Sequence, residues 1–363
     1  MGSQRTAVEA LGIAVAARVP VLLWGAPGTG KTSALRAMAA GAGLPCETVI
    51  AAIREPSDFS GLPVVVDGSV HFAPPRWAER LAAAGRGVLF LDEISTAPPA
   101  VQAALLRVVL ERVVGDLPLP DEVVVVAAAN PPEMASDGWD LSAPLANRFC
   151  HLDWTVAASE LAQGIAGGWD AAPVPDLAAG LAAALPAARG LVSAFVTVRP
   201  ALAVDVPADP AAAGRGWPSP RTWEMAARLL AAASAVEASP EARAALVSGT
   251  VGDAAGLQFL AWEAALDLPD PEAVLADPAA FELPDRGDRA YAVLAAVAAA
   301  VQAEPTVERW RAGWQVLARA GERAPDVAAT AARALAQCRP GGAPAPAEAK
   351  LFLPLLGEAG LLG

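Results

Sequence analysis

Cysteine, histidine and uninterrupted apolar runs are all scarce in this sequence of 363 residues. The three cysteines, Cys46, Cys150 and Cys338, and the two histidines lie far apart, which indicates neither a disulfide framework nor a zinc site. The cysteines are expected to be small, buried residues in a protein of the reducing cytoplasm. The most apolar stretches, 176–198 and 290–301, are interrupted before the ~20 residues that a membrane span needs, so no contact with a membrane is predicted.

Basic charge is also in short supply. The formal net charge is −13 and the pI is about 4.7, a balance that argues against a primary role on nucleic acid or anionic lipid. Of the 26 basic residues, only Lys31 and Lys350 are lysine. Hydrophobic residues, by contrast, make up 55% of the chain. That share is enough to bury a core, and the length favours two or three domains.

A glycine-rich loop follows an apolar run at 21–24 and precedes a helical pattern. Glycine tolerates positive φ, so backbone N–H groups can converge on phosphate oxygens at the start of a helix. In such a loop Lys31 reaches the β- and γ-phosphates and the Thr32 hydroxyl binds Mg²⁺. An accidental glycine-rich turn is the alternative, which the strand and the helix on either side make weaker. The predicted contacts with ATP are Gly25, Ala26, Pro27, Gly28, Thr29, Gly30, Lys31, Thr32 and Ser33.

A second motif, Val-Leu-Phe-Leu-Asp-Glu, occupies residues 88–93. Four apolar residues that end in two acids are typical of a central parallel strand whose carboxyl end faces a ligand crevice. Asp92 is then expected to hold Mg²⁺, and Glu93 to orient and polarise the water that attacks the γ-phosphate. A strand that simply ends on an acidic turn is the alternative. The preceding phosphate loop makes the catalytic interpretation the stronger one.

The remaining pattern up to residue 155 alternates strands with helices, which predicts an α/β fold with a parallel, doubly wound sheet. Asn130 follows a buried run at 123–129, where it can contact phosphate or water, or cap a turn. After residue 157 helices dominate. Further expected elements are strands at 48–53 and 150–154, a hairpin around Asp67 and Gly68, and a core-facing helical stripe of Val307, Trp310, Trp314 and Leu317.

With both phosphate motifs, Asn130, Arg148 and Arg221 in this order, the sequence resembles the AAA+ ATPases and, within them, the MoxR group, over about residues 5–265. The resemblance implies that Asn130 is the sensor 1 residue and that Arg221 is sensor 2, on the γ-phosphate of its own subunit. It also implies that Arg148 is an arginine finger for the neighbouring subunit's nucleotide. Many members have an Asp before that arginine, where this chain has Asn147.

The resemblance also gives the expected domain organisation. A P-loop ATPase core at 1–155, with a hairpin insertion near 62–73, is followed by a helical lid with an Ala/Pro-rich connection at 156–265. A C-terminal helical extension at 266–338 and a Pro/Ala linker with an apolar tail at 339–363 complete the chain.

The function implied is that of a hexameric, Mg²⁺-dependent ATPase that remodels a protein partner, for which the family suggests a von Willebrand factor A domain protein. Two alternatives remain at this point. One is a nucleic-acid motor or loader, against which the net charge counts. The other is a nucleotide-gated scaffold with little hydrolysis, which the presence of both Asp92 and Glu93 disfavours.

Overall fold

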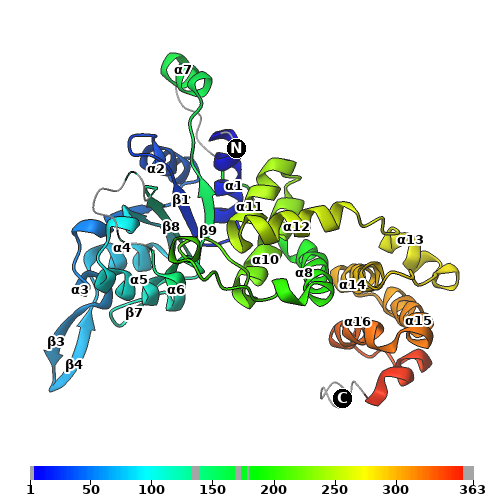
Figure 1. Cartoon of the computed structure of the whole chain (residues 1–363). Coiled ribbons are helices and arrows are strands. Elements are labelled where there is room, and N and C mark those ends of the chain that lie inside the picture. The colour runs from blue at the N-terminus through cyan, green and yellow to red at the C-terminus, as the bar shows by residue number, and fades with distance from the viewer. Residues whose placement is uncertain are drawn as a thin grey trace. The chain divides into compact units, whose positions relative to one another are not determined.

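The computed structural model describes residues 4–131, 134, 139, 141–167, 173–177 and 180–354 (Figure 1). The chain forms two compact units. The first comprises Met1–Leu177 and Val204–Leu257, and the second comprises Ala178–Ala203 and Gln258–Gly363. The end of the expected apolar tail, 355–363, and part of the expected Ala/Pro-rich connection, 168–172, lie outside the described residues. The four-part division expected from the sequence stays a prediction.

The first unit joins an α/β body to helices that come later in the chain. Its body consists of α1 (Gln4–Ala16), β1 (Val21–Trp24), α2 (Lys31–Gly41), β2 (Cys46–Ile50), η1 (Ala51–Ile53), α3 (Ser57–Ser60), β3 (Leu62–Val66), β4 (Ser69–Ala73), α4 (Arg76–Ala84), β5 (Arg86–Asp92), η2 (Ile94–Thr96), α5 (Pro99–Glu111), β6 (Val113–Val114), β7 (Leu117–Pro118), β8 (Glu122–Ala129), α6 (Ala143–Ala146), β9 (Cys150–Asp153) and α7 (Ala158–Gly167). The later elements are α9 (Pro210–Ala213), α10 (Pro220–Ala235), α11 (Pro240–Val251) and the first part of α12 (Asp253–Ala264).

The centre of this unit is a five-stranded sheet in the order β2-β5-β8-β1-β9, in which every pair is parallel. The inner strands β1, β5 and β8 consist mostly of buried apolar residues, as expected for a sheet covered on both faces, whereas the edge strands β2 and β9 carry more polar residues. In the register, Trp24 lies opposite both Ala129 and Asp153, and Ile50 lies opposite Asp92. The carboxyl ends of the strands therefore meet at one edge, and the predicted parallel α/β fold is confirmed.

One predicted strand has different limits. The sequence predicted a strand at 48–53, but β2 covers Cys46–Ile50 and a turn of 3₁₀ helix follows at Ala51–Ile53. The ladder with β5 ends where Ile50 meets Asp92, because β5 itself ends there. Without a partner strand, the next residues satisfy their backbone locally: the N–H of Arg54 bonds the carbonyl of Ala51.

The predicted hairpin is present as β3 and β4, which project from the α/β body (Figure 1). Its turn residues, Asp67 and Gly68, both have positive φ, at 51° and 78°, as a tight hairpin turn requires. Nearly every residue of both strands is exposed. The hairpin therefore adds nothing to the core.

The base of the hairpin is fixed to the turn between β6 and β7. The Phe72 N–H donates to Asp116 Oδ2 over 2.9 Å, and the Asp116 N–H donates to the Phe72 carbonyl over 3.0 Å. Gly61, with φ of 84°, passes so close that a Cβ there would lie 2.7 Å from the Cα of Gly115. Only glycines allow the two turns to approach this closely.

The second unit is helical. It contains α8 (Gly180–Val198), η4 (Pro200–Leu202), the remainder of α12, α13 (Pro271–Ala276), η5 (Pro278–Ala280), α14 (Gly287–Ala303), α15 (Val307–Arg323), α16 (Pro325–Gln337) and η6 (Ala347–Phe352). α8 is long and apolar enough to cross a membrane, but a helix buried in a protein core can have the same length and composition. A Cβ on Gly190 would lie 2.8 Å from the Cβ of Ala295, so α8 packs closely on α14. That contact is of the kind that core helices make.

The expected core stripe of α15 is largely confirmed. Trp310, Trp314 and Leu317 are buried, and the two tryptophan rings meet edge to face with centroids 6.1 Å apart. Val307, predicted to share the stripe, is 38% exposed, because it is the first residue of the helix and lies beyond the packed turns. Phe352 of η6 closes the cluster against Trp314.

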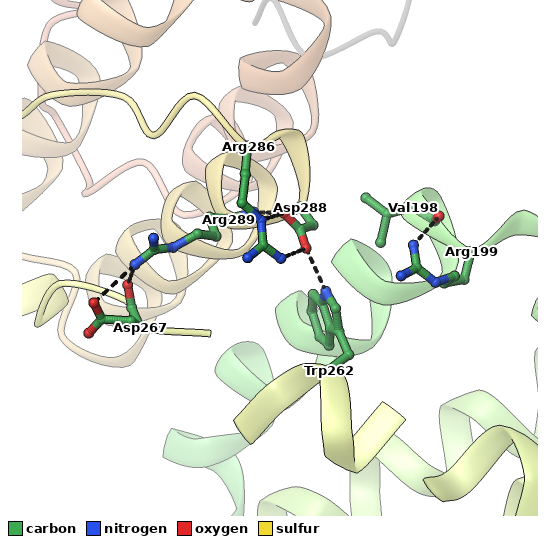
Figure 2. A network of polar contacts seen from close by, with 7 residues as sticks. All are labelled: Val198, Arg199, Trp262, Asp267, Arg286, Asp288 and Arg289. Atoms are coloured by element: carbon green, nitrogen blue, oxygen red, sulfur yellow. Dashed lines mark hydrogen bonds and ion pairs between the residues drawn. The ribbon is translucent and has the colours of Figure 1, made fainter. Parts of the chain in front are cut away.

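Polar contacts join the segments that lead into α14 (Figure 2). Asp288 accepts hydrogen bonds from Arg286 and from the indole N–H of Trp262, and the Arg286 guanidinium holds the pKa of Asp288 below its usual value. Arg289 pairs with Asp267 at 3.3 Å. Because several of these side chains are exposed, the ion pairs contribute little to stability.

Candidate nucleotide site

The glycine-rich loop connects β1 to α2 at the carboxyl edge of the sheet. Gly28 and Gly30 have φ of 77° and 85°, and Gly30 is the N-cap of α2. These are the conformations that the sequence motif requires, and they turn backbone N–H groups toward one concavity at a helix N-terminus. Ser33 is the third residue of α2.

Trp154, for which the sequence predicted no role in the site, contacts the glycine-rich loop. Its indole N–H donates to the Thr29 carbonyl over 3.0 Å, and its backbone N–H donates to the Trp24 carbonyl. A Cβ on Gly25 would lie 2.4 Å from the Trp154 carbonyl oxygen. Gly25 is therefore needed for close packing as well as for room beside an anion.

Lys31 is only 7% exposed, and its ammonium group has three acceptors. It donates to the carbonyls of Gly25 and Ala26 and, over 3.3 Å, to Asn130 Oδ1. Burial lowers the pKa of Lys31, while the carboxylates of Asp92 and Glu93 act in the opposite direction. One buried ammonium therefore joins the phosphate loop to the residue at the end of β8.

Thr32 and Asp92 meet directly. The Thr32 hydroxyl donates to Asp92 Oδ2 over 2.8 Å, while Asp92 Oδ1 accepts the Glu93 N–H over 3.0 Å. Glu93 itself has a φ of 55°, which is uncommon for a residue with a side chain and costs on the order of 1 kcal/mol or more. Such strain is typical of functional sites.

A hydroxyl and a carboxylate are the oxygen ligands that Mg²⁺ prefers. The donor set at Thr32 and Asp92 therefore fits the cation predicted from the sequence. In the described part of the chain, this site included, no group of three or more Cys, His, Asp or Glu side chains could hold a metal ion.

Asn130 follows the last residue of β8, as the sequence predicted. Besides its contact with Lys31, its backbone N–H donates to Ser95 Oγ over 3.3 Å. Ser95 lies in the turn after Glu93. The ends of β5 and β8 are thus tied together, and both ends reach the phosphate loop.

Arg148 and Arg221 form a second group. Arg148 lies between α6 and β9, and Arg221 is the exposed second residue of α10. Burial, and after it the positive charge of Arg221, lowers the pKa of Arg148. One amino group of the Arg148 guanidinium donates to the Pro144 carbonyl, and its Nε has no hydrogen-bond partner among the described residues. Two cations therefore lie within electrostatic reach of each other.

His151 and Trp24 connect the two groups. The Trp24 indole N–H donates to His151 Nδ1 over 2.9 Å, which leaves the proton of the neutral ring on Nε2. That nitrogen donates to the Ala146 carbonyl, also over 2.9 Å. Burial lowers the pKa of His151 to about 4. Arg215 lies 4.3 Å over the Trp24 ring and pairs with Asp153.

The structure thus brings Lys31, Thr32, Asp92 and Asn130 into one hydrogen-bonded group, with Glu93 beside it, and places Arg148 near Arg221. Sequence reasoning missed Trp154, His151 and a buried amide, Asn147. Of the residues that they contact, Ser219 gives a weak signal in the sequence, because it precedes a proline and a helical pattern, as an N-cap residue does. Nothing in the sequence paired these residues across more than 70 positions.

Comparison with known families and proteins gives matches to parts of the chain. Residues 2–135 match the family model described as the Sigma-54 interaction domain, which belongs to the AAA+ proteins. The Psp operon transcriptional activator of Escherichia coli (strain K12) is 44% identical over 77 residues, which cover 20% of this chain and 24% of that protein. The chain therefore spans about a quarter of the relative that it matches.

Solved structures show more remote likenesses. A putative ATPase from Cytophaga hutchinsonii ATCC 33406 has 18% identity and a TM-score of 0.44, over 69% of this chain and 81% of that one. A full-length MCM homolog from Methanopyrus kandleri has 17% identity and a TM-score of 0.40, over 70% of this chain and 54% of that one.

Proposed function

From a nucleotide-binding domain of the AAA+ ATPase type as the premise, we propose that this chain binds ATP with Mg²⁺ and hydrolyses it to ADP and phosphate. It acts as a cytoplasmic, homo-oligomeric ring, a hexamer, of the MoxR kind and remodels a protein partner. The observation that carries the catalytic part is the group of Lys31, Thr32, Asp92 and Asn130 at the carboxyl edge of the sheet. The ring and the partner rest on the sequence resemblance.

The roles follow from the contacts. Lys31 exchanges its loop carbonyls for oxygens of the β- and γ-phosphates, and the loop N–H groups bind the remaining charge. Thr32 and Asp92 would hold Mg²⁺, which neutralises charge on the phosphate oxygens when bound. Glu93 orients the attacking water and takes up its proton as the bond from the γ-phosphorus to the bridging oxygen breaks.

Three further residues act on the γ-phosphate or the water. The Asn130 amide lies beside Lys31, from where it positions the water. Arg221 begins a helix whose N-terminal dipole also favours an anion, and it acts within its own subunit. Arg148 serves the nucleotide of the neighbouring subunit. An arginine finger of this kind accelerates hydrolysis by about 10³- to 10⁵-fold.

The test is steady-state ATPase activity together with ATP binding. Glu93→Gln should bind ATP as tightly as wild type but lose about 10²-fold or more in kcat, because the water loses its base. Lys31→Ala should bind ATP poorly. Wild-type turnover by Glu93→Gln would refute the catalytic assignment. If the wild type is nearly inactive as well, the assay is repeated with a partner present, since a scaffold with little hydrolysis would also turn over slowly.

A second candidate is a role in transcription. It is favoured by one observation, the match of residues 2–135 to the Sigma-54 interaction domain. The two candidates predict different partners: a sigma-54 factor in one case and a von Willebrand factor A domain protein in the other. Co-elution of Glu93→Gln with each purified partner, with ATP and without it, separates them. Stimulation of ATPase activity by DNA at physiological salt would instead favour a nucleic-acid motor.

A further inference from the structure

Asn147 is the residue before Arg148, and its side chain is almost completely buried, with 2% of its surface exposed. It caps the C-terminus of α6 and joins a segment 70 residues further along the chain. Its Nδ2 donates to the Trp217 carbonyl over 3.0 Å, and its Oδ1 accepts the Ser219 hydroxyl over 2.8 Å. All the hydrogen-bonding groups of this contact lie in the first unit.

The contact ends at the start of the helix that carries Arg221. Ser219 is the N-cap of α10: its hydroxyl oxygen accepts the Thr222 N–H over 3.2 Å, and Thr222 Oγ1 accepts the Ser219 N–H over 2.8 Å. This capping box fixes the first turn of α10, in which Arg221 is the second residue. The Ser219 proton that the cap does not use goes to Asn147.

The other side of Asn147 is anchored to the phosphate loop. The residue before it, Ala146, accepts the His151 Nε2 proton, and His151 in turn accepts the indole proton of Trp24. Trp24 immediately precedes Gly25. A continuous path of hydrogen bonds and backbone therefore runs from the start of the phosphate loop to the cap of α10, with Asn147 at its centre.

An amide fits both contacts without a change of protonation, because it offers a donor and an acceptor at adjacent atoms. The Trp217 carbonyl requires the donor, which fixes the orientation of the amide. A carboxylate at position 147 would still accept from Ser219. It would also place an anionic oxygen against the Trp217 carbonyl, where a proton is needed.

We propose that Asn147 is a positioning residue that holds Arg148 and Arg221 in register with each other and with the phosphate loop. Its amide joins the backbone next to one arginine to the helix cap next to the other. This inference rests on the proposed ATPase function, in which Arg221 acts on the γ-phosphate of its own subunit and Arg148 on that of the neighbouring subunit. It adds a buried neutral residue that touches neither substrate nor cation and acts through these two arginines.

The experiment compares Asn147→Asp and Asn147→Leu with wild type in full-length protein. The kcat for ATP should fall by about 10²-fold in both variants, as for a misplaced catalytic group. The KM and the affinity for a fluorescent ATP analogue should stay within about threefold of wild type, because the phosphate loop keeps its own contacts.

Leu81→Ala is the control for a loss of stability alone. Leu81 is fully buried on α4 of the same unit, which packs on β5 and β7 and carries neither arginine. Its replacement should lower Tm and leave kcat unchanged. If Asn147→Leu keeps kcat within about twofold of wild type, or if Leu81→Ala loses as much activity, Asn147 is no positioning residue.

Amide hydrogen exchange gives a readout that is independent of hydrolysis. In Asn147→Asp, exchange should accelerate by about tenfold or more in peptides covering 144–149 and 217–224, and should remain unchanged in 21–36. Unchanged exchange in all three peptides overturns the proposal. Faster exchange in a protein whose wild type does not hydrolyse ATP supports the positioning contact and refutes the ATPase function instead.

Discussion

The two halves of the candidate site differ in how their charges are matched. In the half built on the phosphate loop, Lys31 lies near Asp92 and Glu93, and its protons are directed to oxygen acceptors. In the other half, the charge that acts on Arg148 is that of Arg221, which has the same sign. In the first half, opposite charges lie close together within one chain, whereas the second half concentrates positive charge.

The difference shows what each half can do alone. A cluster in which opposite charges attract each other can keep its geometry without a ligand. Two neighbouring cations raise each other's energy, and the protein has to hold them by other means, here through Asn147 and the cap of α10. A phosphate group bound by either arginine reduces that repulsion.

The largest expected effect tests whether the two halves of one active site come from different subunits. Arg148→Ala and Glu93→Gln should each lower kcat severely, the first by about 10³- to 10⁵-fold. When the two inactive variants are mixed and allowed to exchange subunits, activity should return, because Glu93→Gln subunits supply Arg148 to neighbours that have Glu93. Steady-state ATPase measurement of the mixture detects this recovery.

The control for that mixture replaces Arg148→Ala by Arg221→Ala. Since Arg221 acts within its own subunit, no combination with Glu93→Gln creates an intact site, and the mixture should remain inactive. Recovery in the second mixture alone would mean that Arg221, not Arg148, acts on the neighbouring subunit's nucleotide. Recovery in neither mixture would mean that the site does not combine residues of two subunits.

The next effect concerns His151, which connects the two halves. Its pKa is about 4 in the folded protein and near 6.5 when unfolded, so the unfolded chain binds more protons between these pH values. The free energy of unfolding should therefore fall by about 3 kcal/mol as the pH is lowered from 7 to 4. Urea unfolding of wild type and His151→Gln across this range measures this contribution, because the variant lacks the titrating group and should lose less stability as the pH falls.

The only other histidine provides the comparison. His71 lies on the exposed hairpin strand β4, and His71→Gln should keep the pH dependence of wild type. A His151→Gln protein whose stability falls as steeply as that of wild type would show that other groups account for the acid sensitivity.

The smallest effect tests the packing of the phosphate-loop half. Gly25→Ala places a methyl group 2.4 Å from the Trp154 carbonyl oxygen and should reduce the free energy of unfolding by about 1–3 kcal/mol. ATP affinity should fall with it, because the loop and β9 are forced apart. Gly167→Ala is the control, since a Cβ there meets no atom within 4 Å. Equal Tm values for the two variants would mean that the loop yields without cost.

Sequence reasoning found the parts of the site that depend on local chemistry. Gly28, Gly30, Lys31 and Thr32 form one uninterrupted motif, and Asp92 ends a strand whose apolar run is unmistakable. The limits of β2 were wrong at both ends, because they depend on where the neighbouring strand stops. Residues such as Asn147 and Trp154 could not be found, since their importance comes from partners brought near by the fold.

The arrangement of the second unit was less accessible still. Its helices are rich in alanine, which indicates a helix but not which face is buried. Pro186 lies inside α8, where a sequence reading expects a break. The close packing of α8 on α14 depends on Gly190, whose place opposite Ala295 no local pattern reveals.

The hairpin of β3 and β4 has a consequence for how this molecule can change. Its exposed strands take no part in the core, while its base is fixed by Gly61, Phe72 and Asp116. Residues 63–71 can therefore be lengthened, shortened or exchanged for another hairpin at little cost in stability, provided that the base is kept. The sequence of this hairpin can thus change, in evolution or by design, without altering the candidate nucleotide site.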